Sequence, residues 1–201
     1  MSKNKRSKII QLKPTRLSSE KYIKTQARSL PIAECLINSD WESTGISSII
    51  IARRHKTGNM TVGLYLTDLF CLGLKDAQYR FNLSPEDYSD FKDIYPDWKQ
   101  CDYTLAHNLI YGAIAFAEDY GFKPCKEFFV AQFILDEDDE NVELLEIEFG
   151  LDGKPFYMTG PYDDKVKIAS IINTLTRTAG PGNFTIVNDE EDFNHDKLDV
   201  D

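Results

Sequence analysis

Cys71 and His107 are the two residues in this sequence whose types best suit covalent chemistry. A thiolate is a strong nucleophile, and a neighbouring histidine is the usual group that removes its proton. Cys71 comes just after a predicted strand, where catalytic residues are common, and His107 lies on the clearest predicted helix. Asp68, Asp76 or Asp102 could orient the histidine, and Asp76 completes the candidate catalytic set. This set would suit a small hydrolase or transferase.

A packing role for the cysteine and the histidine competes with this chemistry. Free cysteine is among the most frequently buried residue types. His107 has Tyr103 and Tyr111 on either side at helical spacing, which is typical of rings packed along one helix face. No segment around Cys71 resembles a signature of cysteine hydrolases. The sequence therefore favours a non-catalytic protein, with the cysteine-dependent enzyme as the alternative.

The acidic segment after residue 135 is a candidate cation site that fails on spacing. Asp136, Asp138 and Glu140 occupy the first, third and fifth positions of an EF-hand loop. The sixth position should be glycine and is Asn141, and the twelfth should be glutamate and is Ile147. We therefore interpret this segment as a solvated loop.

Other metal and phosphate motifs are missing from the sequence. The four cysteines form no CxxC pair and no cluster with histidine at zinc-ligand spacing. Gly160-Pro161 precedes a predicted helix, but Asp163 and Asp164 at the same helix end would repel an anion. There is no glycine-rich phosphate-binding motif. The sequence predicts neither a metal site nor a cofactor.

The charge of the chain is strongly divided. The net charge is −10, yet residues 1–28 carry nine Lys and Arg against one acid, whereas residues 29–201 carry 14 against 32. Such a basic segment suits an acidic partner, such as a nucleic acid backbone or the acidic body itself. A solvated extension that aids solubility explains it equally well. The candidate nucleic-acid-binding residues, in this segment and in a predicted hairpin, are Lys5, Arg6, Lys8, Arg53 and Arg54.

Capping residues and helical spacing predict four helices. One begins at Ser18 or Ser19, and a second begins at Ser84-Pro85 with an N-cap serine and a proline in the first helical position. The clearest runs from about Tyr103 to Tyr120 and is followed by Gly121. The last begins near Asp163-Asp164.

Turn residues and alternation predict the strands. A first hairpin pairs residues 49–55 with residues 60–67, and a second pairs residues 145–149 with residues 156–157 around an Asp152-Gly153 turn. Residues 128–135 are apolar on both faces and predict a central strand. A final strand covers residues 184–187.

Hairpins are commoner than βαβ units in this order. The sequence therefore predicts an α+β fold with a largely antiparallel mixed sheet and helices packed mainly on one face. We expect a basic disordered tail over residues 1–17, one domain over residues 18–188 and an acidic disordered tail over residues 189–201. The chain has no apolar signal segment and no long apolar run, so we expect a cytoplasmic protein without membrane contact.

Several segments of the chain together resemble an uncharacterised bacterial protein family. They are GLYLTDLFCLGLKD at residues 63–76, AHNLIYGAIAFAEDYGFKP at residues 106–124 and EFGLDGKPFYMTGPYDD at residues 148–164. The resemblance covers about residues 30–165 and implies a bacterial, cytosolic protein that acts as one unit. It implies no activity, ligand or catalytic residue.

These observations favour an interaction or regulatory module with a protein partner. The absence of enzyme motifs and the charged tails support this hypothesis. The first alternative is the hydrolase or transferase that uses Cys71 and His107. The second is a protein that associates with nucleic acid through its basic N-terminal segment.

Overall fold

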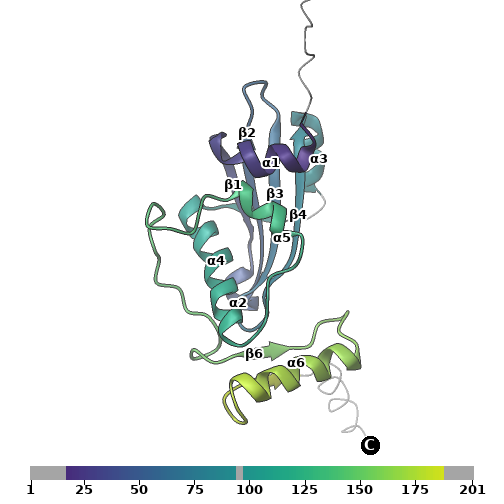
Figure 1. The fold of residues 1–201 in the computed structure, drawn as a ribbon, viewed down its shortest axis with the longest axis vertical. Coiled ribbons are helices and arrows are strands. Elements are labelled where there is room, and N and C mark those ends of the chain that lie inside the picture. Colours follow the sequence, from purple (N-terminus) through teal and green to yellow (C-terminus); the bar gives the residue numbers. More distant parts are fainter. Residues whose placement is uncertain (1–16, 94–96, 188–201) are drawn as a thin grey trace, which may run out of the picture.

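Five antiparallel strands form the centre of the computed structural model, which describes residues 17–93 and 97–187 (Figure 1). The strands lie in the order β4-β3-β2-β1-β5, so consecutive strands from β1 to β4 are neighbours. This arrangement confirms the predicted α+β class with its antiparallel sheet. The strands are β1 (Ile32–Asn38), β2 (Ile46–Arg54), β3 (Met60–Asp68), β4 (Gly73–Leu83) and β5 (Trp98–Gln100).

The predicted first hairpin is present as β2 and β3. Successive side chains of a strand point to opposite faces of the sheet. Ile49 and Ile51 accordingly join one hydrophobic cluster, whereas Ile50 and Ala52 join another. Both faces of this hairpin are therefore buried. Strand β3 is buried on both sides because a helix also covers the outer face of the sheet.

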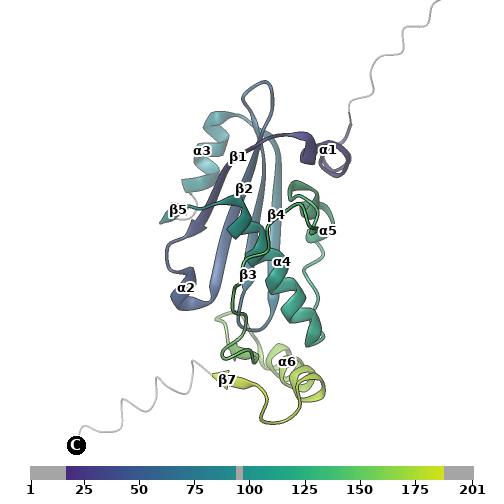
Figure 2. The same ribbon diagram turned by 90° about the vertical axis from the view of Figure 1, so that its left-hand side faces the viewer.

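Helices on one face of the sheet cover the larger cluster (Figure 2). The long helix α4 packs Leu109, Ile110 and Ala113 onto the sheet, and all three are fully buried. The N-terminal helix contributes Ile23 and Ala27 to the same cluster. The elements on this side are α1 (Ser19–Gln26), the 3-10 turn η1 (Ala27–Ser29), α4 (Tyr103–Asp119), α5 (Phe128–Ala131) and the 3-10 turn η2 (Gln132–Ile134).

A single helix covers the opposite face near one end of the sheet (Figure 2). Helix α3 (Pro85–Asp93) buries Tyr88 and Phe91 against Ile50, Val62 and their neighbours. Tyr88 Oη donates a hydrogen bond of 2.5 Å to Glu34 of β1. The short helix α2 (Trp41–Thr44) connects β1 to β2. Helices therefore pack mainly, but not only, on one face.

The strand predicted at residues 128–135 is wrong. This segment forms α5 and η2, with Phe128, Val130, Ala131 and Ile134 buried and Phe129 68% exposed. A short apolar run has no clear period of its own, so a buried helical turn looks like a central strand. Packing against α1 and the sheet makes this segment helical and not a strand.

The second predicted hairpin is also wrong. Residues 143–149 form no strand, and instead lie along α4, where Asn108 Nδ2 donates to the carbonyl of Glu143 and Asn108 Oδ1 accepts from the amide of Leu145. The turn and the strand at Phe156–Tyr157 were predicted correctly, but this strand, β6 (Phe156–Met158), pairs with residues 185–187 instead. Asp152 and Gly153 both have positive φ, as the expected turn requires, and close an isolated bridge.

A separate parallel strand pair lies at the lower end of the sheet (Figure 1). Its elements are β6 (Phe156–Met158), α6 (Lys165–Thr178) and β7 (Thr185–Val187), which we call the C-terminal unit. The unit is held to the body by a small cluster of four buried residues. These are Cys71, Tyr157, Ile171 and Leu175.

The proposed tails lie outside the described residues, apart from Leu17. Within residues 17–93 and 97–187, no helix has the length and apolar character needed to cross a membrane.

Candidate functional site

Cys71 lies at the junction between the body and the C-terminal unit. Its side chain is fully buried beside Tyr157, Ile171 and Leu175. The Asp68 carboxylate accepts hydrogen bonds of 3.0 Å from the amides of Phe70 and Cys71, which fixes the turn after β3. Burial, and then the charge of Asp68, raise the pKa of the Cys71 thiol far above its ordinary value. The thiol therefore keeps its proton at neutral pH.

His107 is also buried, but in another part of the core. Its ring lies between Tyr103 and Tyr111, with centroid distances of 5.8 Å and 4.6 Å. Burial lowers the pKa of His107, although the backbone of Asp136 and the charge of Asp138 act in the opposite direction. Among the described residues, no group hydrogen-bonds to its Nε2 atom. A neutral, enclosed imidazole is what this environment favours.

The structure does not bring Cys71 and His107 together. The chain just after Cys71 meets the end of α4, since a Cβ atom built on Gly73 would lie 2.6 Å from that of Ala117. His107 lies in the second turn of the same helix. The rise of an α-helix separates these positions by roughly 15 Å. A thiolate–imidazole pair requires hydrogen-bond distance.

Asp76, the third candidate catalytic residue, belongs to a different group on the edge strand β4. Its carboxylate, the Cys125 thiol and the Glu127 carboxylate lie within 4.8 Å of one another. Among the described residues, these three side chains are the set whose ligand atoms lie close enough together to hold one metal ion. Burial raises the pKa of Cys125, so its proton would have to be displaced by any ion. We therefore do not assign a metal to it.

Arg53, predicted as a nucleic-acid contact, points into the protein instead. The residue is only 2% exposed. Its guanidinium donates to the carbonyls of Ile134 at 2.5 Å and Leu30 at 2.7 Å, and binds the Asp136 carboxylate at 2.6 Å. These bonds tie β2 to the segments after α1 and η2. The guanidinium therefore faces the interior, where a phosphate backbone could not reach it.

Arg54 occupies the surface of the β2–β3 hairpin, and its side chain is exposed. Its guanidinium is therefore accessible to solvent, unlike that of Arg53. The other three candidates, Lys5, Arg6 and Lys8, lie outside the described residues.

A groove along helix α6 is the feature that sequence reasoning missed. It has a volume of about 630 Å³ and continues into a second hollow of about 560 Å³ on the outer face of the same helix. Val166, Ser170 and Thr174, spaced one turn apart, line both. We call the combined feature the α6 groove. Its opposite wall is formed by Leu72, Leu74, Lys75, Phe122, Lys123 and Cys125.

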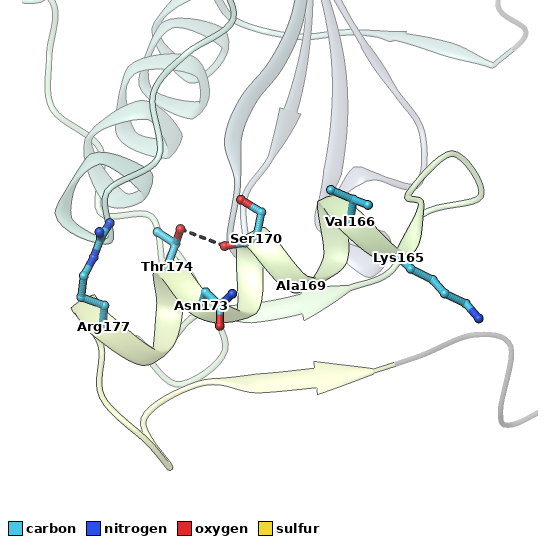
Figure 3. A pocket seen from close by; sticks show the side chains of 7 residues that line it. All are labelled: Lys165, Val166, Ala169, Ser170, Asn173, Thr174 and Arg177. Atoms are coloured by element: carbon cyan, nitrogen blue, oxygen red, sulfur yellow. Dashed lines mark hydrogen bonds between the residues drawn. The ribbon is translucent and has the colours of Figure 1, made fainter.

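Figure 3 shows how the outer face of α6 is arranged, with Lys165 and Arg177 at the two ends of a row of uncharged residues. Val166, at the first turn, is 79% exposed although it is apolar. Thr174 Oγ1 donates back to the carbonyl of Ser170, so the hydroxyl of Thr174 is satisfied within the helix. The row therefore lines the outer hollow with uncharged side chains and has an apolar one near one end.

Asp163 fixes the position of α6. Its side chain is 3% exposed and accepts from Tyr157 Oη at 2.8 Å, from the amide of Gly160 at 2.9 Å and from Lys167 Nζ at 2.5 Å. Burial alone would raise the pKa of Asp163, but the hydrogen bonds from Lys167, Gly160 and Tyr157 lower it to about 2. Asp164 caps the helix by accepting from the amide of Lys167. The acids that argued against an anion site at this helix end are thus structural.

Comparisons of this chain with protein-family models, with curated proteins and with solved structures gave no match.

Proposed function

We propose that this protein is a non-catalytic interaction module that binds a partner protein through the α6 groove. The observation that carries this proposal is the unpartnered face of α6. A helix stabilised by packing normally turns its apolar residues inward. Val166 instead stands 79% exposed beside an open groove with Leu72, Phe122 and Ile171 in its lining. Apolar side chains grouped around a groove mark interaction surfaces.

The positions of Cys71 and His107 support a non-catalytic role. Both are packed into the interior, and they belong to different parts of the core. A buried thiol stays protonated, and the thiolate is the nucleophilic form. The enzyme alternative needs Cys71 to react rapidly in the native protein. Labelling with iodoacetamide at pH 7, followed by peptide mass spectrometry, should find Cys71 far slower than in the urea-unfolded chain. Equal rates would restore the enzyme hypothesis.

Two substitutions of exposed apolar residues test the interaction module. Val166→Asp places a charge in the groove, and Leu144→Asp places the same charge at a residue that is 88% exposed elsewhere. Proteins that co-purify with the tagged chain from its native cells would be quantified for the wild type and both variants. We expect a protein that is lost with Val166→Asp and retained with Leu144→Asp. A set of co-purifying proteins that is the same for all three would reject the proposal.

A specific contact on the opposite side of the fold favours nucleic acid as a second candidate partner. The Lys24 ammonium lies 4.3 Å from the centroid of the Phe129 ring, and Phe129 is 68% exposed. The Arg28 guanidinium lies 5.1 Å from the Phe133 ring. Exposed aromatic rings among cations suit base stacking. Residues 1–16 contain no aromatic side chain, whereas α5 and η2 supply Phe129 and Phe133 beside α1.

This second candidate has its own test. Retention of a single-stranded RNA oligonucleotide on a filter would be compared for the wild type, Phe129→Ala and a chain lacking residues 2–16. Stacking on an aromatic side chain contributes roughly 1–3 kcal/mol per base, so Phe129→Ala should weaken retention about tenfold. Salt-sensitive retention that is unchanged in both variants would exclude the surface and the segment.

A further inference from the structure

We infer that the α6 groove takes an acidic, amphipathic segment of its partner protein. This inference rests on the proposed function and names the chemistry of the partner. It combines three properties of the groove, namely its shape, its apolar lining and its charge.

The shape of the groove fits an extended or helical peptide. Val166, Ser170 and Thr174 line both hollows and follow one stripe of the helix. Helix α6 has 14 residues. At the rise of an α-helix it is roughly 21 Å long, enough for several residues of a bound segment. The site is therefore a trough rather than a small-molecule pocket.

The lining requires apolar side chains from the partner. Leu72, Phe122 and Ile171 contribute to one stretch of the groove, next to the exposed Val166. Apolar surface of this kind gains about 25 cal/mol for each Å² removed from water. A purely polar or phosphate-rich ligand would leave it uncovered. This property favours a peptide over a nucleic acid.

The charges require acids on the same partner. Lys75, Lys123 and Lys167 line the groove, where Asp164 is the only acid, and Lys165 and Arg177 line its outer hollow. Among the described residues, no carboxylate lies within ion-pair distance of Lys75 or Lys123.

The wider sequence makes this cationic groove unusual for the chain. Residues 165–187 contain three cations and no acid, whereas residues 29–201 as a whole carry 14 Lys and Arg against 32 acids. Lys167 is paired with Asp163, but no ion pair among the described residues involves the other four cations, which are Lys75, Lys123, Lys165 and Arg177. They are gathered in a body that would otherwise repel an anion. Complementary potentials of this kind select partners and speed their association. An acidic segment with regularly spaced apolar residues satisfies both the lining and the charge.

The test is fluorescence anisotropy with three short labelled peptides on the full chain. In the probe, glutamates alternate with leucines; in one control serines replace the leucines, and in the other lysines replace the glutamates. We expect the probe to bind and both controls to bind at least tenfold more weakly. Equal binding of the serine control would overturn the apolar requirement, and equal binding of the lysine control would overturn the acidic one.

Charge reversal locates the binding. Lys123 and Lys56 are both exposed, but Lys56 lies in the β2–β3 hairpin. Lys123→Glu should weaken probe binding by roughly tenfold, because it replaces an attraction with a repulsion. Lys56→Glu should change it by less than about twofold. Equal effects of the two reversals would place the probe outside the groove and overturn the inference.

The two levels of the proposal can fail separately. If Val166→Asp releases the native partner but the acidic probe does not bind, the interaction module stands and the inferred partner chemistry is wrong. If the native partner is also unaffected by Val166→Asp, both are wrong. An RNA oligonucleotide that competes with the probe and loses affinity with Lys123→Glu would assign the groove to nucleic acid instead.

Discussion

Arg53 is a residue whose surroundings decide its role. As part of an Arg-Arg-His run in a hairpin, it suggested a surface for phosphates. In the fold, the guanidinium forms hydrogen bonds to carbonyls from two distant segments, at Leu30 and Ile134. A buried arginine is tolerated when its donors are satisfied and its charge is paired, as here by Asp136. Arg53 thus acts as a structural connection between β2 and its covering elements.

Removing this guanidinium should be costly. Arg53→Met retains apolar bulk but leaves the carbonyls of Leu30 and Ile134 without their donor. We expect a loss of about 2–4 kcal/mol in the free energy of unfolding, because two carbonyls lose their donor. The exposed neighbour gives the control, since Arg54→Met should change stability by less than about 0.5 kcal/mol. Urea denaturation of both variants measures the difference. Similar midpoints would mean that the buried contacts contribute little.

Two glycines allow backbone strain to be separated from a steric clash. Gly73 and Gly58 both have positive φ, at 66° and 90°. A Cβ atom at Gly73 would lie 2.8 Å from the carbonyl oxygen of Ala113, whereas nothing lies within 4 Å at Gly58. Gly58→Ala should therefore cost about 1–2 kcal/mol from conformation alone.

Gly73→Ala should cost more than its control, because α4 has to move away from the sheet as well. We expect roughly 3–5 kcal/mol in total, in the range of overpacked and strained sites. Thermal unfolding of the two variants gives the comparison. Equal losses of stability in the two variants would show that α4 can move away from residue 73 without further destabilisation.

At the scale of elements, strong local signals predicted position and type well. Ser18 accepts a hydrogen bond from the amide of Lys21 and caps α1, and Asp164 caps α6 in the same way. The helix expected at Tyr103–Tyr120 is α4 at Tyr103–Asp119. Caps and helical spacing act within one or two turns, so they remain informative without knowledge of the tertiary structure.

Elements that depend on distant packing were predicted poorly. Phe128–Ile134 is helical because α1 and the sheet cover it, and Glu143–Leu145 is held by Asn108 of α4. The α6 groove is formed between residues far apart in sequence, such as Phe122 and Val166. No periodicity within either segment marks such a groove. The charge pattern was the available signal, since residues 165–187 contain no acid.

The attachment of α6 should depend on pH through Asp163. Its pKa of about 2 in the folded chain lies below its ordinary value of 3.8. Because the folded value is the lower one, the stabilising contribution is complete above about pH 5 and is lost as the pH falls toward 2. Asp163→Asn should reduce stability by roughly 1–2 kcal/mol at pH 7 and flatten the loss between pH 5 and 2.

The measurement is urea unfolding at several pH values. Asp164→Asn provides the control, because asparagine caps a helix nearly as well as aspartate. It should keep the wild-type decline below pH 5. An undiminished decline in Asp163→Asn would assign the acid sensitivity to other carboxylates.

At the scale of the whole molecule, the C-terminal unit and the five-stranded body differ in the size of the hydrophobic clusters that stabilise them. The body buries two clusters on the faces of its sheet. The C-terminal unit relies on a smaller cluster, in which partly buried residues such as Phe122 and Ile168 surround four buried ones, and on two strands of three residues each. Local opening is easiest where few apolar contacts are present.

Hydrogen exchange should therefore divide the protein in two. We expect amides of α6 and β6 to exchange at least tenfold faster than those of β2 and β3. Pulse labelling with mass spectrometry resolves peptides of this size. If an acidic peptide occupies the α6 groove, α6 should become slower while β2 remains the same. Uniform protection across both parts would indicate a single cooperative unit.

Helix α1 lies in the upper half of the molecule, whereas the C-terminal unit forms its lower end (Figure 1). Immobilising the protein through its N-terminus would consequently turn the α6 groove away from a sensor surface, whereas a fusion after β7 would place its cargo beside the groove. The choice of terminus for a tag thus determines whether a binding assay samples the groove or obstructs it.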